Sequence, residues 1–142
     1  MIRRRLPREH AIKKSVTVLL IDEDIIVLDL TRQVLEQCGG YRVLPAHGFA
    51  AADALLADGR KIDVLIADMR ASLSDDVYHR AVERCPAIAT VLVFDAVRGR
   101  PRRAPPRTEL LSMPYGIQEL LDAVNRALAA VAGLRTSTAA GR

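Results

Sequence analysis

The stretch that most constrains the fold is residues 63–68, Asp-Val-Leu-Ile-Ala-Asp, in which four apolar residues stand between two acids. The run is too short for a helix, and it does not alternate with polar residues. This pattern is typical of a strand that helices bury on both faces. Asp68 then falls at the end of that strand. Because open α/β sheets bind ligands at the carboxyl ends of their strands, we expect Asp68 to lie at a functional edge.

A second apolar run, Val16–Ile21, leads directly into Asp22, Glu23 and Asp24. If the two runs are neighbouring strands, Asp22, Glu23 and Asp68 converge on one edge of the sheet. Three carboxylates at one place would suit a hard divalent cation such as Mg²⁺, which takes oxygen ligands. The alternative is that these acids only cap helices or line strand ends.

Strand and helix patterns alternate along the chain. Strands are expected at 16–21, 41–46, 63–68, 89–94 and 109–113, and helices at 25–37, 49–56, 75–84 and 116–131. Alternation of this kind implies a parallel sheet with right-handed crossovers. The predicted fold class is therefore α/β, a three-layer sandwich with helices on both faces of a five-stranded sheet.

The chain of 142 residues has the length of one domain. We expect a basic flexible arm at 1–14, the domain itself at 15–132 and a disordered tail at 133–142. No apolar run approaches the ~20 residues that a membrane span requires, and no apolar signal core follows the basic start. A cytoplasmic protein without a membrane partner is the expectation.

Much of the net charge of +4 comes from the arm and from residues 98–107, where five arginines and three prolines fall within ten residues. Prolines lack a backbone donor and clash with the preceding turn, so no normal helix is expected there. One interpretation is a solvated mobile loop, and the other is a contact surface for an acidic partner or for nucleic acid phosphates. The residues of that surface would be Arg98, Arg100, Arg102, Arg103 and Arg107.

The chain resembles the receiver domain of two-component response regulators from about Val16 to Val131. The resemblance rests on Leu19–Asp24, Tyr41–Gly48, Asp63–Asp68 and Met113-Pro114-Tyr115. It implies a flavodoxin-like fold with strand order 2-1-3-4-5. The composition of the stretch before the last strand predicts that the fourth helix of that fold is reduced or missing.

The resemblance also implies a chemistry. Asp68 would be the phosphoacceptor, attacking a phosphohistidine on a sensor kinase or a phosphotransfer protein. Asp22, Glu23 and Asp68 would bind Mg²⁺ together with the backbone carbonyl of Arg70. The metal would neutralise charge while the carboxylate attacks phosphorus.

Two departures fall on this machinery. Asp95 stands where the family has Ser or Thr, and Met113 stands where it has Lys. An ionised carboxylate ~4 Å from a phosphoryl oxygen would cost about 4 kcal/mol at an effective dielectric constant near 20. Without the lysine, no cation offsets that cost. We expect impaired phosphorylation of Asp68, with weak Mg²⁺ binding retained.

The leading hypothesis is a stand-alone atypical receiver, or pseudo-receiver, of a phosphorelay. It would signal by contact with a protein in trans: a sensor kinase, a phosphotransfer protein or a downstream regulator. The first alternative is a working phosphoacceptor at Asp68, with Arg70 or an arginine of 98–107 replacing the lysine. The second is a small basic protein that associates with nucleic acid. A hydrolytic enzyme is not expected, because no second acid/base residue at a hydrolase spacing follows Asp68, and a homodimer is left open.

Overall fold

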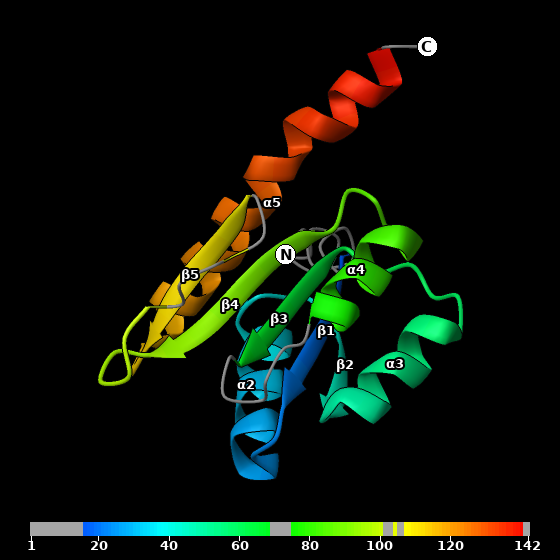
Figure 1. Cartoon of the computed structure of the whole chain (residues 1–142). Coiled ribbons are helices and arrows are strands. Elements are labelled where there is room, and N and C mark those ends of the chain that lie inside the picture. The colour runs from blue at the N-terminus through cyan, green and yellow to red at the C-terminus, as the bar shows by residue number, and fades with distance from the viewer. Residues whose placement is uncertain (1–15, 69–74, 101–103, 105–106, 141–142) are drawn as a thin grey trace, which may run out of the picture.

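Five parallel strands form one sheet in the computed structural model, which describes residues 16–68, 75–100, 104 and 107–140 (Figure 1). The strand order is β2-β1-β3-β4-β5. The strands are β1 (Thr17–Asp22), β2 (Arg42–His47), β3 (Val64–Asp68), β4 (Ala89–Asp95) and β5 (Thr108–Met113). The predicted fold class and strand order are confirmed. Each strand begins and ends within one residue of its predicted bounds.

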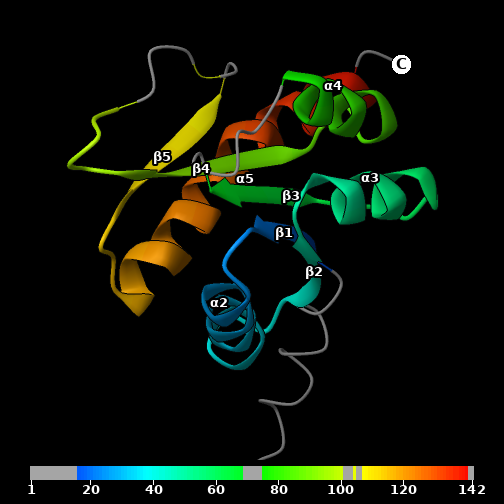
Figure 2. The ribbon, with the colours of Figure 1, turned by 60° about the horizontal axis from the view of Figure 1, so that its bottom comes forward.

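Four helices cover the sheet: α2 (Ile25–Gln37), α3 (Phe49–Ala57), α4 (Asp75–Arg84) and α5 (Ile117–Ala140). Figure 2 shows α2 and α5 on one face of the sheet, and α3 and α4 on the other. This is the predicted three-layer sandwich. The basic arm predicted at 1–14 lies outside the described residues. No helix in the described part of the chain is long and apolar enough to cross a membrane.

The central strands β1 and β3 are apolar on both sides because each side faces a helical layer. Leu19 and Leu65 pack with residues of α3 and α4, and Leu20 and Ile66 pack with residues of α2 and α5. All four side chains are at most 3% exposed. Burial of each contributes about 1.5–3 kcal/mol, so these two strands form the centre of both cores.

Helix α2 has the predicted bounds, and its termini show why. The Asp24 carboxylate accepts hydrogen bonds from the Ile26 and Val27 amides, at 3.0 and 3.3 Å, and so caps the helix. At the other end the chain leaves the helix through Gly39 and Gly40, and Gly40 has a positive φ of 72°. Only glycine adopts that conformation at low cost, so the sequence ends the helix there.

No helix is present in the described residues between β4 and β5, as predicted. After β4 the chain turns immediately, with the Arg98 and Gly99 amides each 3.0 Å from the Asp95 carbonyl oxygen. Residues 101–103 and 105–106 lie outside the described part of the chain. The described residues of this connection, 96–100, 104 and 107, therefore contribute no helix to the layer of α3 and α4.

Helix α5 differs from its predicted end at Val131, because it continues to Ala140. The tail predicted from residue 133 thus begins within this helix. A single Gly133 costs a helix about 1 kcal/mol relative to Ala. The residues before it are rich in alanine, a strong helix former, so this one glycine is a weak stop signal.

We predict opposite effects for two Gly-to-Ala variants. A Cβ at Gly39 would lie 2.7 Å from ring carbons of Tyr41 and 2.9 Å from the Leu35 carbonyl oxygen. Gly39→Ala should therefore lower the free energy of unfolding by about 1–3 kcal/mol through overpacking. Urea unfolding measures this quantity directly.

The matched control is Gly133→Ala, since no atom lies within 4 Å of a Cβ at that position. It should leave the protein unchanged or stabilise it by about 0.5–1 kcal/mol, because Ala favours the helix. Equal destabilisation by both variants would contradict the steric explanation.

Candidate functional site

The site begins where β1 and β3 end together. Ile21 of β1 is in register with Ala67 of β3, so the next residues, Asp22 and Asp68, leave neighbouring strands side by side. Both are buried, at 8% and 3% exposure. The structure therefore brings together two of the three carboxylates that the sequence predicted, and we call Asp22 and Asp68 the acidic pair.

Local hydrogen bonds hold the chain after β1. The Asp22 Oδ1 atom accepts a 2.8 Å hydrogen bond from the Asp24 amide. The Glu23 side chain is exposed, while its carbonyl oxygen lies 2.7 Å from Nε2 of His47 at the end of β2. The Glu23 backbone is thus tied to the neighbouring strand, and the position of Glu23 as a metal ligand stays a prediction.

The acidic pair fits a magnesium ion in donor type and number. Mg²⁺ is commonly held by one or two carboxylates, with water completing the octahedron. The described residues contain no group of three or more His, Cys, Asp or Glu side chains placed to hold a metal. Arg70, predicted to add its carbonyl, lies outside the described residues. Asp22 and Asp68 are therefore the side chains that would hold the ion.

Asp95 ends β4 on the same edge of the sheet. Val93 is in register with Asp68, so Asp95 lies two residues further along, where it is in register with Met113. Its Oδ1 atom accepts a 2.8 Å hydrogen bond from the Val97 amide. The carboxylate thus stabilises its own turn, and it is half-buried.

Met113 ends β5 and contributes no charge. Its side chain is half-buried and packs against the core beneath α2 and α5. A thioether in this position fills space and cannot neutralise an anion. The edge that carries the acidic pair therefore has no cation from this strand end.

Tyr115 is a site residue that the sequence did not single out. Burial is the main cause that raises the pKa of its phenol. A hydrogen bond with Thr31 opposes that shift, and the charges of Asp22 and Asp68 add to it. The phenol therefore lies near the acidic pair, keeps its proton at neutral pH and remains a hydrogen-bond donor. The buried Thr31 could have been found from the spacing of Leu28, Thr31 and Leu35 along one face of α2.

The arginine-rich segment is described only in part. Arg98 and Arg107 are exposed. The Arg100 guanidinium lies over the Phe94 ring, 5.9 Å from its centroid, a contact worth about 0.5–1 kcal/mol when exposed. Arg102 and Arg103 lie outside the described residues. The role of the segment in binding a partner stays a prediction.

Large apolar side chains are exposed around the acidic edge. They are Ile25, Ile26 and Leu30 of α2, Ile117 of α5 and Val97 after β4, and their exposed fractions run from 52% to 94%. Both helices and Val97 follow strand ends at this edge of the sheet. We call these five residues the apolar rim. Large apolar side chains that stay exposed near such an edge can be covered by a binding partner.

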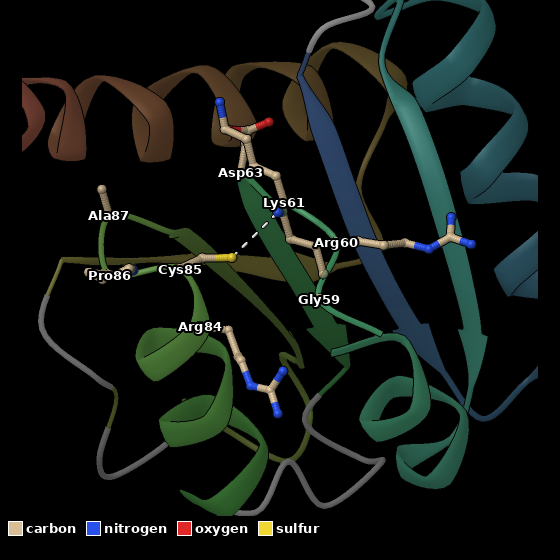
Figure 3. Close-up of a pocket in the computed structure, with 9 residues that line it drawn as sticks. Gly59, Arg60, Lys61, Asp63, Arg84, Cys85, Pro86 and Ala87 are labelled. Atoms are coloured by element: carbon tan, nitrogen blue, oxygen red, sulfur yellow. Dashed lines mark hydrogen bonds and ion pairs between the residues drawn. The ribbon is translucent and has the colours of Figure 1, made fainter. Parts of the chain in front are cut away.

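A pocket of about 430 Å³ lies at the opposite end of the sheet, lined by residues 59–63 and 84–87 (Figure 3). Cys85 accepts a 3.4 Å hydrogen bond from the Ile62 amide in its wall. Arg60 points away from Cys85, and Arg84 donates to the Leu56 carbonyl oxygen of α3 at 3.1 Å. Lys61 and Asp63 in its lining form a 3.9 Å ion pair with each other, at the end of the sheet away from the acidic pair, so the pocket adds no chemistry to the site.

Comparisons with known proteins agree on the fold. No protein-family model and no curated protein matches the chain. The structure resembles a response regulator receiver protein from Sinorhizobium medicae WSM419, with 26% identity, a TM-score of 0.66 and coverage of 82% of this chain and 96% of that one. It also resembles the signal receiver domain of an HD domain-containing protein from Pseudomonas fluorescens Pf-5, with 24% identity, a TM-score of 0.68 and coverage of 85% and 92%.

A CheY-like receiver domain protein from Methanospirillum hungatei JF-1 is similar as well, with 18% identity, a TM-score of 0.63 and coverage of 83% and 97%. At these identities the shared feature is the architecture. The chain has the fold of a response regulator receiver domain.

We predict that Tyr115 ionises above the usual tyrosine pKa of about 10. Its raised pKa favours the protonated phenol in the folded state. The resulting stability is fully present below the unfolded pKa and is lost as pH rises through the folded pKa. The difference in phenolate absorbance between the wild type and Tyr115→Phe, followed across alkaline pH, measures the folded value.

The same difference taken in concentrated denaturant is the control, and it should return to about 10. Ionisation of Tyr115 at or below that value in the folded protein would contradict the burial of its phenol, the main cause of the raised pKa.

Proposed function

We propose that this chain is an atypical receiver module of two-component signal transduction. It signals mainly by contact with a protein in trans, and phosphoryl transfer to Asp68 is impaired. The fold supports the first part of the proposal, since the chain has the architecture of receiver domains. The composition of the acidic edge supports the second part.

The impaired phosphoryl transfer is inferred from the charges of the side chains around the acidic pair. A phosphoryl group on the buried Asp68 would bring its negative charge next to the buried carboxylate of Asp22. At the ends of β4 and β5 it would meet another carboxylate, Asp95, and the apolar Met113. Such an anion needs cations or oriented donors in a site of low dielectric constant. Repulsion would therefore disfavour the phosphorylated state.

A bound Mg²⁺ would offset part of this charge by polarising the phosphoryl oxygens. Asp22 and Asp68 would hold it. In this arrangement Asp68 keeps the position of a nucleophile, while Asp95 holds the turn after β4 through its bond to the Val97 amide. The chain's own residues thus favour metal binding more than phosphoryl transfer.

Protein contact is supported by the apolar rim beside the acidic pair. A partner that buried these large apolar side chains would gain about 25 cal/mol of binding free energy for each Å² of apolar surface removed from water. A sensor kinase, a phosphotransfer protein or a downstream regulator would approach this edge and cover the rim. Such a partner would bind whether or not Asp68 carries a phosphoryl group.

A working phosphoacceptor is the second candidate, and Tyr115 favours it. Its phenol keeps a proton near Asp68 and could donate a hydrogen bond to a phosphoryl oxygen. A neutral donor supplies less stabilisation than the missing cation would, because it adds no opposite charge to offset the charge of the phosphoryl group. This candidate predicts slow phosphorylation that depends on Tyr115.

We predict no stable phosphoryl adduct when the protein is incubated with Mg²⁺ and acetyl phosphate. Intact-mass measurement should show the unmodified chain, because Asp95 and Met113 replace the hydroxyl donor and the cation. A mass gain of one phosphoryl group that Asp68→Asn abolishes would overturn impaired transfer. If Tyr115→Phe also abolishes that gain, the second candidate is correct.

The matched variant restores both groups, as Asp95→Thr with Met113→Lys. It should recover a detectable fraction of phosphorylated chain under the same conditions. If it stays unmodified while its circular dichroism spectrum is unchanged, these two positions do not explain the impairment.

We also predict weak binding of Mg²⁺ at the acidic pair. Titration with millimolar Mg²⁺ should shift the backbone amide resonances of Asp22 and Asp68, and Asp22→Asn should remove the shifts because it deletes one of two carboxylate ligands. Glu23→Gln is the comparison, since the Glu23 side chain is exposed. Shifts that survive Asp22→Asn unchanged would place the ion elsewhere.

A further inference from the structure

The turn from β1 to α2, residues 22–24, carries Asp22 of the acidic pair. Hydrogen bonds inside the turn shape it locally. The Asp24 amide donates to the Asp22 Oδ1 atom at 2.8 Å, and the Asp24 carboxylate accepts a 3.0 Å hydrogen bond from the Ile26 amide at the start of the helix. Each of these bonds joins residues two positions apart, so they give the turn its shape without fixing it against a neighbouring strand.

A contact from the neighbouring strand fixes the turn in space. His47 is the last residue of β2 and is in register with Asp22. Its Nε2 atom lies 2.7 Å from the carbonyl oxygen of Glu23. A carbonyl oxygen only accepts hydrogen bonds, so Nε2 must carry a proton and act as the donor. The neutral ring is therefore the Nε2–H tautomer, and the same donor is present when the ring is protonated.

The backbone after His47 ends the strand level with the turn. Gly48 follows with a φ of 94°, a conformation that glycine adopts at low cost, and α3 begins at the next residue. The His47 ring itself is exposed and belongs to neither core cluster. Its replacement would therefore change the turn more than the core.

The orientation of Asp22 depends on this turn. The donor to its Oδ1 atom is the amide of Asp24, the residue that directly follows Glu23. A turn that was free to move would move that donor, and the carboxylate would sample more orientations beside Asp68. A ligand that must be ordered on binding lowers the affinity for a metal, whereas groups that orient a ligand from outside the coordination shell raise it.

We propose that His47 is a positioning residue of the metal site. Its Nε2–H group holds the Glu23 carbonyl oxygen, and this contact keeps the Asp22 carboxylate in place to bind Mg²⁺ together with Asp68. His47 does not touch the ion. The inference rests on the Mg²⁺ binding proposed above, and it adds a third strand, β2, to the elements that build the site.

Mg²⁺ titrations of four full-length proteins test this role: the wild type, His47→Ala, His47→Gln and His47→Asn. The backbone amide resonances of Asp22 and Asp68 report the midpoint of each titration. The amide nitrogen of Gln takes the place of Nε2, whereas that of Asn takes the place of Nδ1 and is too short to reach the carbonyl oxygen. We expect the midpoint to rise about two- to tenfold in the Ala and Asn variants, as the loss of one hydrogen bond implies, and to stay near the wild-type value in the Gln variant.

The outcomes separate this role from the proposed function. Equal midpoints in all four proteins, or equal weakening in the Gln and Asn variants, overturn the positioning role and leave Mg²⁺ binding intact. A wild type without shifts contradicts Mg²⁺ binding itself, and the positioning role fails with it. Urea unfolding of the same proteins is the control for stability, and the Gln and Asn variants should unfold at the same concentration because the ring they replace is exposed.

The wild type alone supplies a second test. In a long-range ¹H–¹⁵N spectrum at alkaline pH, the His47 ring should show a protonated Nε2 and an unprotonated Nδ1. A ring with a protonated Nδ1, or with both tautomers in exchange, overturns the contact with Glu23 on which the positioning role depends.

Discussion

The arrangement of the site depends on the burial of β1 and β3 on both faces. A strand covered by helices on both sides must stay apolar over its length, and its first polar residue marks the point where it leaves the core. Because Ile21 and Ala67 are in register, the two strands leave the core at the same level. Asp22 and Asp68 are thereby placed side by side by core packing, with no need for a direct attraction between them.

That placement has an electrostatic cost that a receiver with a lysine would offset. Here β4 ends in a carboxylate and β5 in a methionine that packs into the core. In the loop after β4, the guanidinium of Arg100 lies over the Phe94 ring. The carboxylate of Asp95 is partly compensated by the amide of its own turn. The described edge therefore remains acidic and polar at its centre, with an apolar rim around it.

The sequence predicts an element correctly where a local signal decides where that element begins or ends. The apolar face of residues 25–37 and the glycines after it predict α2 to the residue, and the uninterrupted apolar runs predict which strands lie at the centre. The prolines after Arg98 predict the loss of a helix. The end of α5 was missed because a lone glycine gives a weak stop signal inside an alanine-rich segment. Tyr115 was missed because its position beside Thr31 and the acidic pair depends on packing between α2 and the start of α5. Single-sequence periodicity does not contain that information.

Strand β5 is buried more deeply on one face than on the other. On the side of α3 and α4, Leu110 is only half-buried. On the other side Leu111 is buried beneath a continuous apolar stripe of α5, formed by Leu120, Ala123, Val124, Ala127 and Val131. The Glu109–Arg126 ion pair joins the same two elements, although an exposed pair contributes only about 0–1 kcal/mol. The ladder with β4 and burial against α5 therefore hold β5 in the sheet together. Since β5 carries Met113 at its end, the packing of α5 also fixes which side chain stands opposite Asp95.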